Sequence, residues 1–292
     1  MKKILPLMVF ACLISLSCQK EIELEQPAYQ KKIVVDGYIE TGQPAHIFLT
    51  MSSPFLTQYD SASIRASFLN YAKITLTSSL GEEEVLTLFR ENRFFPPFVY
   101  KSVDIKGQEG IFYRIKVEVM GQTLSAETMI PPAVEIVGSR FIEVNDSTGF
   151  WEVAIDASKH GELFLFTRMK SHLAQEDFHP SFNPVYKVKN SQQGLVWLRL
   201  LSSSKFKSYF NNTESMVYEN YEGYVFDRRD TIELIVGTIN ATSYQVLNSL
   251  FVDMFNQENP FAFNGNRIET NIEGGIGRWT GIGIKNVTLL AN

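Results

Sequence analysis

The residue type with the most specific chemistry in this sequence is cysteine. The chain has two cysteines, Cys12 and Cys18. Cys18 directly follows the small residue Ser17. A small residue at that position permits cleavage just before a cysteine, whose thiol can then be acylated. Because no cysteine follows Cys18, disulfides, thiol redox chemistry and cysteine-ligated zinc are excluded from the rest of the chain.

The first 17 residues have the form of a signal peptide. Lys2 and Lys3 make a positive start, and an apolar stretch follows them up to Leu16. This stretch is shorter than the roughly 18–20 residues that cross a bilayer as a helix, so a transmembrane anchor is disfavoured. We therefore expect residues 1–17 to be removed and Cys18 to become a mature N-terminus that carries lipid, including palmitate.

The residues before Cys18 resemble a lipoprotein lipobox. They read Ser15-Leu16-Ser17-Cys18, with serine at 15 where leucine is usual. Cys12 also follows a small residue, Ala11, but cleavage there would leave a short apolar region and an apolar mature end. The alternative interpretation is an ordinary secretory signal in which Cys18 carries no lipid.

Residues 18–30 are polar and form a predicted tether to the body. Gln19, Lys20 and Glu21 open it, and a cysteine followed by Gln-Lys and acidic residues resembles the export signal of Bacteroidota lipoproteins that reach the cell surface. The alternative is a solvated spacer without an address function. The first interpretation predicts a lipid-anchored, surface-exposed protein of the outer membrane.

Two clusters of ionisable side chains could in principle do chemistry. His172 and His179 lie in one segment with Glu176 and Asp177, but their spacing matches no familiar metal motif. His46 and His160 stand apart from them, in a predicted strand and a predicted turn. Neither a Gly-x-Ser-x-Gly nor a His-Glu-x-x-His motif occurs.

The second cluster consists of Glu222, Asp227 and Asp230, which could pair as in glycoside hydrolysis. Arg228 and Arg229 lie between two of them, so surface ion pairs are the simpler interpretation. From these patterns we expect no catalytic residues, no metal site, no cofactor and no enzyme activity. A hydrolase with an unrecognised site stays a lesser alternative.

Aromatic residues make up 13% of the chain and are concentrated in two runs, Phe94–Tyr100 and Tyr218–Tyr224. Exposed aromatic rings anchor protein interfaces and line ligand clefts. The competing interpretation is that these rings fill β-sheet cores, and it applies equally to Pro260–Phe263. The net charge of −5 becomes more negative without Lys2 and Lys3, which argues against nucleic acid as a partner.

The body is predicted to be mainly β. Apolar and polar residues alternate from Ile111 to Val119, which is typical of a half-buried antiparallel strand. Gly121-Gln122 then predicts a hairpin turn to a return strand. Similar short strands separated by Gly, Pro, Ser and Asn predict an immunoglobulin-like β-sandwich at 31–132, and Pro131-Pro132 ends it.

Residues 133–292 are expected to form a second, β-rich domain with one amphipathic helix at 243–259. Thr242 and Gln245 predict a capping box at its start, and Pro260 blocks its continuation. Alternating glycines follow at 274–283, which predicts a strand with bulges or a close backbone approach. No phosphate loop is expected, because the helix precedes the glycines.

Several segments in order resemble the Bacteroidota lipoproteins classed as domain of unknown function 4249. The matching segments are Lys32–Ile39, Ile47–Thr50 with Ser52-Ser53-Pro54, Ala72–Thr77, Ala126–Thr128 before Ile130-Pro131-Pro132, Asn259-Pro260-Phe261 and Asn271–Gly277.

This resemblance implies an outer-membrane lipoprotein of the kind often encoded beside a TonB-dependent receptor. It suggests an accessory or substrate-capture subunit of that receptor, and it supplies no catalytic residues. The alternative is a free-standing binding or adhesion lipoprotein.

Overall fold

The computed structural model describes residues 29–53, 60–92, 96–158, 161–175, 177–188, 194–202, 225–256 and 268–291. Residues 32–292 form one compact unit. The elements in the first half are β1 (Ile33–Glu40), β2 (Pro44–Met51), α2 (Ser61–Ala66), β3 (Lys73–Ser78), β4 (Glu83–Val85), β5 (Thr87–Arg90), β6 (Phe98–Lys106), β7 (Phe112–Val119) and β8 (Gln122–Met129). The second half contains β9 (Glu135–Glu143), β10 (Thr148–Asp156), β11 (Leu163–Ser171), β12 (His179–Val188), β13 (Leu195–Leu200), β14 (Phe226–Asp227), β15 (Thr231–Ile239), α4 (Ala241–Asn256) and β16 (Ile276–Leu290).

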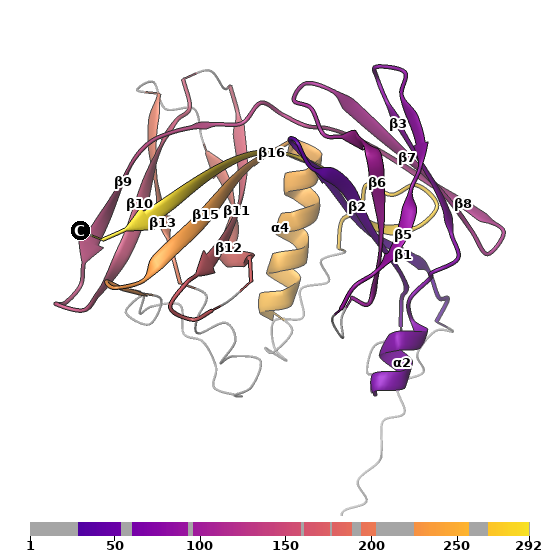
Figure 1. Cartoon of the computed structure of the whole chain (residues 1–292), viewed down its shortest axis with the longest axis horizontal. Coiled ribbons are helices and arrows are strands. Elements are labelled where there is room, and N and C mark those ends of the chain that lie inside the picture. The colour runs from indigo at the N-terminus through magenta and orange to yellow at the C-terminus, as the bar shows by residue number, and fades with distance from the viewer. Residues whose placement is uncertain are drawn as a thin grey trace, which may run out of the picture. The chain divides into compact units, whose positions relative to one another are not determined.

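One eight-stranded sheet runs through both halves, in the order β12-β11-β15-β16-β1-β2-β6-β5. Two four-stranded sheets accompany it: β4-β3-β7-β8 in the first half, and β13-β10-β14 with β9 beside β10 in the second. Figure 1 shows these strands on either side of α4. The prediction of a mainly β fold with sandwich-like packing and an amphipathic helix is confirmed.

The first sandwich follows from period-two patterns in its strands. In β7, Tyr113, Ile115 and Val117 are buried, and Arg114 and Lys116 are exposed, as the alternation predicts. The buried side chains meet those of β1 and β2 across the space between the two sheets and form one core. Trp279 of β16 is fully buried in this core, and its indole N–H donates to the Tyr113 carbonyl at 2.9 Å.

The second sandwich has its own core, between the other end of the large sheet and the strands β9, β10, β13 and β14. Leu165 of β11, Val236 of β15 and Val153 of β10 are completely buried there. Strand β9 pairs with β10 in this sandwich, and β12 pairs with β11 at the edge of the large sheet.

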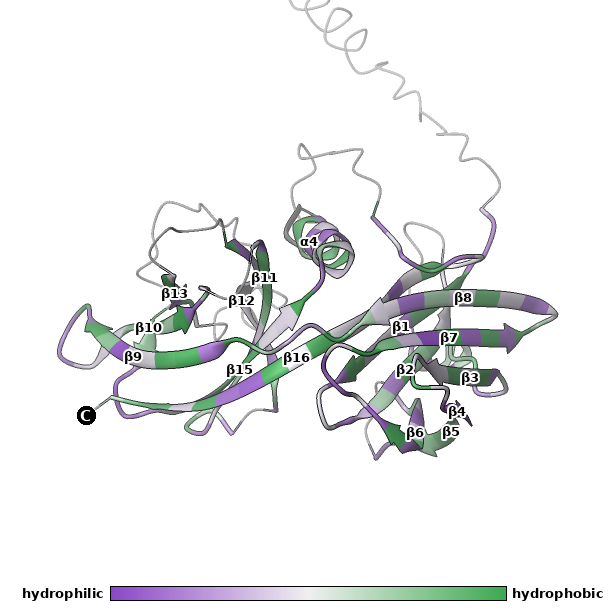
Figure 2. Ribbon diagram, turned by 90° about the horizontal axis from the view of Figure 1, so that it is seen from above, coloured by the Kyte–Doolittle hydropathy of each residue, from purple (hydrophilic) through white to green (hydrophobic). Residues whose placement is uncertain are grey.

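Strand β16 joins the two halves. Its first part pairs in parallel with β1, from Val34–Ile276 to Glu40–Ile282, and its second part pairs with β15, from Thr238–Gly283 to Thr231–Leu290. Figure 2 shows β16 passing from β1 to β15. The division into domains 31–132 and 133–292 stays a prediction, but the sheet of the first half includes residues 276–282 from the far end of the chain.

The predicted close backbone approach occurs at the glycines of β16. A Cβ on Gly281 would lie 2.6 Å from the carbonyl carbon of Met129, and one on Gly283 would lie 3.1 Å from the Ala133 nitrogen. The segment between β8 and β9 therefore crosses β16 at these glycines, which have no side chain to obstruct it. Gly277 has φ of +113°, a conformation that favours glycine.

Helix α4 covers the face of the large sheet that points away from the two sandwich cores. Its Tyr244 ring lies 4.9 Å from the Phe164 ring, and Phe251 lies 6.1 Å from Phe166. The helix begins at Ala241, before the predicted residue 243, and residues 257–259 of the prediction lie outside the described residues.

The predicted capping box at Thr242 and Gln245 is wrong. Asn240 caps the helix instead: its side-chain oxygen accepts from the Ser243 N–H at 2.8 Å, and its carbonyl accepts from the Tyr244 N–H. An asparagine directly before the first helical residue can reach the third N–H of the helix, which explains the earlier start. The short helix α2 was not predicted, because its one and a half turns bury no residue and leave no apolar stripe.

Candidate functional site

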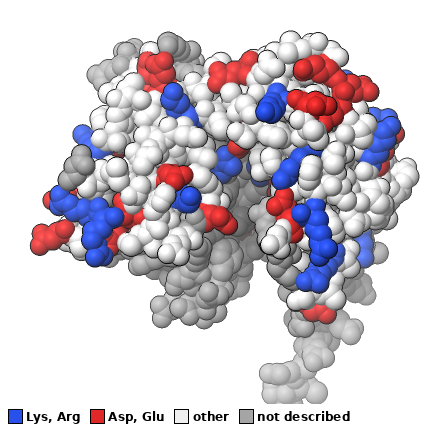
Figure 3. Space-filling model, viewed as in Figure 1, with Lys and Arg blue, Asp and Glu red and all other residues white. Residues whose placement is uncertain are grey.

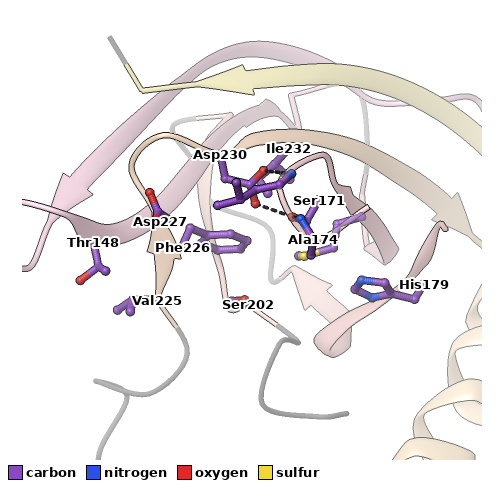
Figure 4. Close-up of a pocket in the computed structure, with 12 residues that line it drawn as sticks. Thr148, Ser171, Ala174, His179, Ser202, Val225, Phe226, Asp227, Asp230 and Ile232 are labelled. Carbon is purple, nitrogen blue, oxygen red and sulfur yellow. Dashed lines mark hydrogen bonds between the residues drawn. The ribbon is translucent and has the colours of Figure 1, made fainter. Parts of the chain in front are cut away.

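A cavity of about 350 Å³ opens at one end of the second sandwich. It lies among β10, β11, β14, β15 and the start of β12, and Figure 4 shows its lining side chains. Three of them, Met169, Phe226 and Ile232, also belong to the buried core and give the cavity an apolar wall. The polar side chains are Thr148, Ser171, His179, Ser202, Asp227 and Asp230.

Asp230 is the most buried charged residue of this cavity, with 8% of its surface exposed. It lies in the turn between β14 and β15. Its carboxylate accepts from the Ser171 hydroxyl at 2.5 Å and from the Leu173 N–H at 2.9 Å, as the dashed lines in Figure 4 show. The Ser171 oxygen in turn accepts from the Ala174 N–H at 2.9 Å, so Asp230 holds the turn that follows β11.

Asp227 confirms the ion-pair interpretation of the acidic cluster, whereas Asp230 does not. The Arg229 side chain donates to both carboxylate oxygens of Asp227, at 3.0 and 2.8 Å, and Arg228 pairs with Glu143 at 2.6 Å. The bonds from Arg229 lower the pKa of Asp227 from 3.8 to about 2. Glu222, the third member of the predicted cluster, lies outside the described residues.

We expect Asp227 to titrate near 2 and its pKa to return toward the ordinary 3.8 in Arg229→Ala. A carboxyl group whose pKa is lower in the folded state stabilises the protein at pH values above its unfolded-state pKa. This contribution is lost as the pH falls through the folded-state pKa. Carboxyl carbon NMR across pH 1.5–6 would measure the shift. Arg65→Ala, a change distant in sequence on α2, should leave the Asp227 curve unchanged, and a wild-type midpoint near 3.8 would refute the assignment.

His172 and His179, the two histidines of the first cluster, make different contacts. His172 contacts the carboxylate of Glu233 on β15, and this contact lowers the pKa of Glu233. His179 lines the cavity, and its Nδ1 lies 3.0 Å from the Pro180 carbonyl oxygen. Asp177 is exposed, and Glu176 and His160 lie outside the described residues. Within the described ranges, no three His, Cys, Asp or Glu side chains are arranged to hold a metal ion.

His46 lies in β2, as predicted, and belongs to a different surface. Its ring stacks on Tyr38 at 5.2 Å, on the face of the large sheet that also bears α4. Tyr100, from the first aromatic run, is part of the core, where its hydroxyl donates to the Leu69 carbonyl at 3.1 Å. Phe94, Phe95, the run 218–224 and the segment 260–263 lie outside the described residues.

A partly buried pair of ion pairs on the α4 side of the sheet was not predicted. Arg168 of β11 pairs with Glu40 at the end of β1, and Arg278 of β16 bonds to Asp36 at 2.6 Å. Burial raises the pKa of Glu40, and the Arg168 guanidinium opposes that rise. The polar alternation Asp36, Tyr38, Glu40 was the only local signal, because the partner arginines are distant in sequence.

The predicted lipidation site Cys18 and the export signal Gln19, Lys20 and Glu21 lie outside the described residues. The model for "Domain of unknown function (DUF4249)" matches residues 19–285. The chain belongs to this family.

The DUF4249 match confirms the family recognised from the sequence. No curated protein matches the chain. Among solved structures, a DUF4785 family protein from Legionella pneumophila is similar at 11% identity with a TM-score of 0.21; the alignment covers 70% of this chain and 51% of that one. This chain therefore spans about half the length of that structure.

The DUF4249 chain presents a surface of mixed charge. Figure 3 shows Lys and Arg side chains interspersed with Asp and Glu over the face that it draws. In the parts of the chain that the structure describes, no helix is both long and apolar enough to cross a bilayer.

Proposed function

We propose that this DUF4249 protein is a surface-exposed lipoprotein of the outer membrane, anchored through Cys18, that serves a TonB-dependent receptor as an accessory or substrate-capture subunit. The observation that carries the proposal is the position of the family match, which begins at residue 19, directly after the predicted lipidated cysteine. A family match that starts there agrees with a mature chain beginning at Cys18.

The architecture of the body supports a role in binding. The first strand begins at Ile33, so residues 19–32 separate the predicted lipid from the first sandwich. The body has no thiol, and the described ionisable clusters are engaged in ion pairs or in holding turns. A cavity with an apolar wall and several polar groups is the usual form of a small-molecule binding site.

Cys18→Ala is expected to abolish lipid incorporation and to release or mislocalise the protein. Cys12→Ala is the matched control, because Cys12 lies inside the predicted signal peptide and should not affect labelling. Metabolic labelling with an alkyne-bearing palmitate, followed by membrane fractionation, measures both effects. Equal labelling of wild type and Cys18→Ala would reject lipidation at this residue.

Surface exposure and partnership need separate measurements. Protease treatment of intact cells should digest the wild-type protein, and its protection would reject the surface assignment without affecting the anchor. Purification from detergent-solubilised outer membranes at native abundance should recover a TonB-dependent receptor with it. Recovery of the protein alone would favour the alternative, a free-standing binding or adhesion lipoprotein.

A further inference from the structure

The cavity beside Asp230 combines an apolar wall with one buried carboxylate. Met169, Phe226 and Ile232 expose little surface because they are shared with the core, so the wall is rigid and well packed. The volume of about 350 Å³ lies in the range of small-molecule sites. Asp230 lies in this wall, and Figure 4 shows it above the Phe226 ring.

The charge of Asp230 is not neutralised within the described part of the chain. The two adjacent cations are engaged elsewhere, since Arg229 pairs with Asp227 and Arg228 pairs with Glu143. The carboxylate receives two neutral hydrogen bonds, which offset part of its desolvation and leave its negative charge in place. Two oxygens that each accept one bond keep further lone pairs for a donor.

The cation that fits this site is organic rather than metallic. A metal ion prefers several anionic or imidazole ligands, and the described residues do not gather three of them anywhere. Most of the lining is hydrocarbon or aromatic, which favours a ligand with an apolar body. The aromatic ring of Phe226 in the same lining also suits a cation.

We propose that this cavity binds a primary amine attached to an apolar body, with the ammonium group on Asp230 and the apolar part against Met169, Phe226 and Ile232. The ammonium donates to the carboxylate, and its positive charge makes these bonds stronger than neutral ones. The inference goes beyond the proposed function and does not depend on the anchor or on a receptor. If the protein is a capture subunit, the inference names the class of compound that it captures.

A set of three probes with the same ring and different charge tests the proposal. Tryptamine is the cation, tryptophol is its neutral analogue and indole-3-propionate is the anion. Titrations of the purified full chain, followed through the methionine methyl resonances by NMR, should show tryptamine shifting Met169 at sub-millimolar concentration. Tryptophol should bind at least tenfold more weakly, and the propionate should cause no shift.

Asp230→Asn should weaken tryptamine binding at least tenfold and leave tryptophol binding unchanged. The amide keeps the shape: its oxygen can accept from the Leu173 N–H, and its NH2 can donate to the Ser171 oxygen. Glu233→Gln is the matched control, because its carboxylate lies on β15, three residues after Asp230 and outside the cavity lining, and the change should alter the affinity less than twofold. Ala174→Trp offers an independent test: Ala174 is exposed at the cavity, so a bulky side chain there should block binding without disturbing the core.

Equal affinity for tryptamine and tryptophol, or tryptamine binding that survives Asp230→Asn, would overturn the proposal. Binding that shifts other methionines and leaves Met169 unchanged would place the site elsewhere and overturn it too. Loss of receptor co-purification in cells would reject the proposed partnership and leave these titrations unaffected, so the two failures are distinguishable.

Discussion

Gly281→Ala is expected to destabilise the protein by about 3 kcal/mol or more, one of the two largest effects that we predict. The added Cβ would lie 2.6 Å from the carbonyl carbon of Met129 and 2.9 Å from the nitrogen of Ile130. Both neighbours are backbone atoms, so no side chain can rotate away to make room. The crossing of β16 under the segment after β8 would have to open, and urea denaturation would measure the loss.

Gly138→Ala is the matched control for this substitution. Gly138 also lies in a strand, β9, and a Cβ there would meet nothing within 4 Å. The change should be neutral or stabilise slightly, because alanine reduces the freedom of the unfolded chain. Equal stability of Gly281→Ala and Gly138→Ala would contradict the tight crossing.

Arg168→Met is expected to cost about 3 kcal/mol of unfolding free energy, because it leaves the Glu40 carboxylate buried without its main partner. The side chain of Glu40 is 9% exposed and that of Arg168 is 19% exposed, so water replaces little of the lost interaction. Arg278 also acts on Glu40 and limits the effect. The double variant Glu40→Gln/Arg168→Met should recover most of the stability, since it removes the unpaired charge.

The pH dependence of Arg168→Met provides a second readout. Burial already raises the pKa of Glu40 from 4.5 and Arg168 lowers it, so removing Arg168 raises it further. The folded state then binds more protons than the unfolded state, and stability falls as the pH rises from 4.5 through the raised value. The deficit of the variant should therefore shrink in acid.

Arg114→Met is the control for the loss of an arginine. Arg114 pairs with Glu127 at the surface, with side chains 65% and 46% exposed, so its removal should cost less than about 1 kcal/mol at any pH. A deficit of Arg168→Met that is equally small, or independent of pH, would show that the Glu40 pair contributes little.

Local patterns in the sequence were sufficient where structure depends on near neighbours. The alternation from Ile111 to Val119 predicted β7, its buried face and its hairpin with β8, because a strand repeats every two residues. Apolar residues at helical spacing after residue 243 likewise predicted α4. Its cap was missed, because Asn240 and Thr242 are both good capping residues and only the backbone geometry distinguishes them.

The candidate site was only partly accessible from the sequence. Asp227, Asp230 and His179 could be named as ionisable residues near one another or near a turn. The ion pair of Asp227 with Arg229 is local, and the sequence predicted it. The role of Asp230 depended on contacts with Ser171 and Leu173, which lie 59 and 57 residues away in the sequence. Sequence spacing shows which nearby residues a side chain can contact. It does not show which distant strand lies beside it.

By itself, the sequence determined the kinds of elements in the body and the absence of thiols beyond Cys18, because composition and short-range periodicity are local properties. Only the tertiary structure decided how those elements combine. It paired Asp36 with Arg278 across 242 residues and buried Trp279 in the first core. It also left the Asp230 carboxylate facing a cavity. The physical reason is that burial and charge pairing depend on neighbours in space, which strand pairing brings together from opposite ends of the chain.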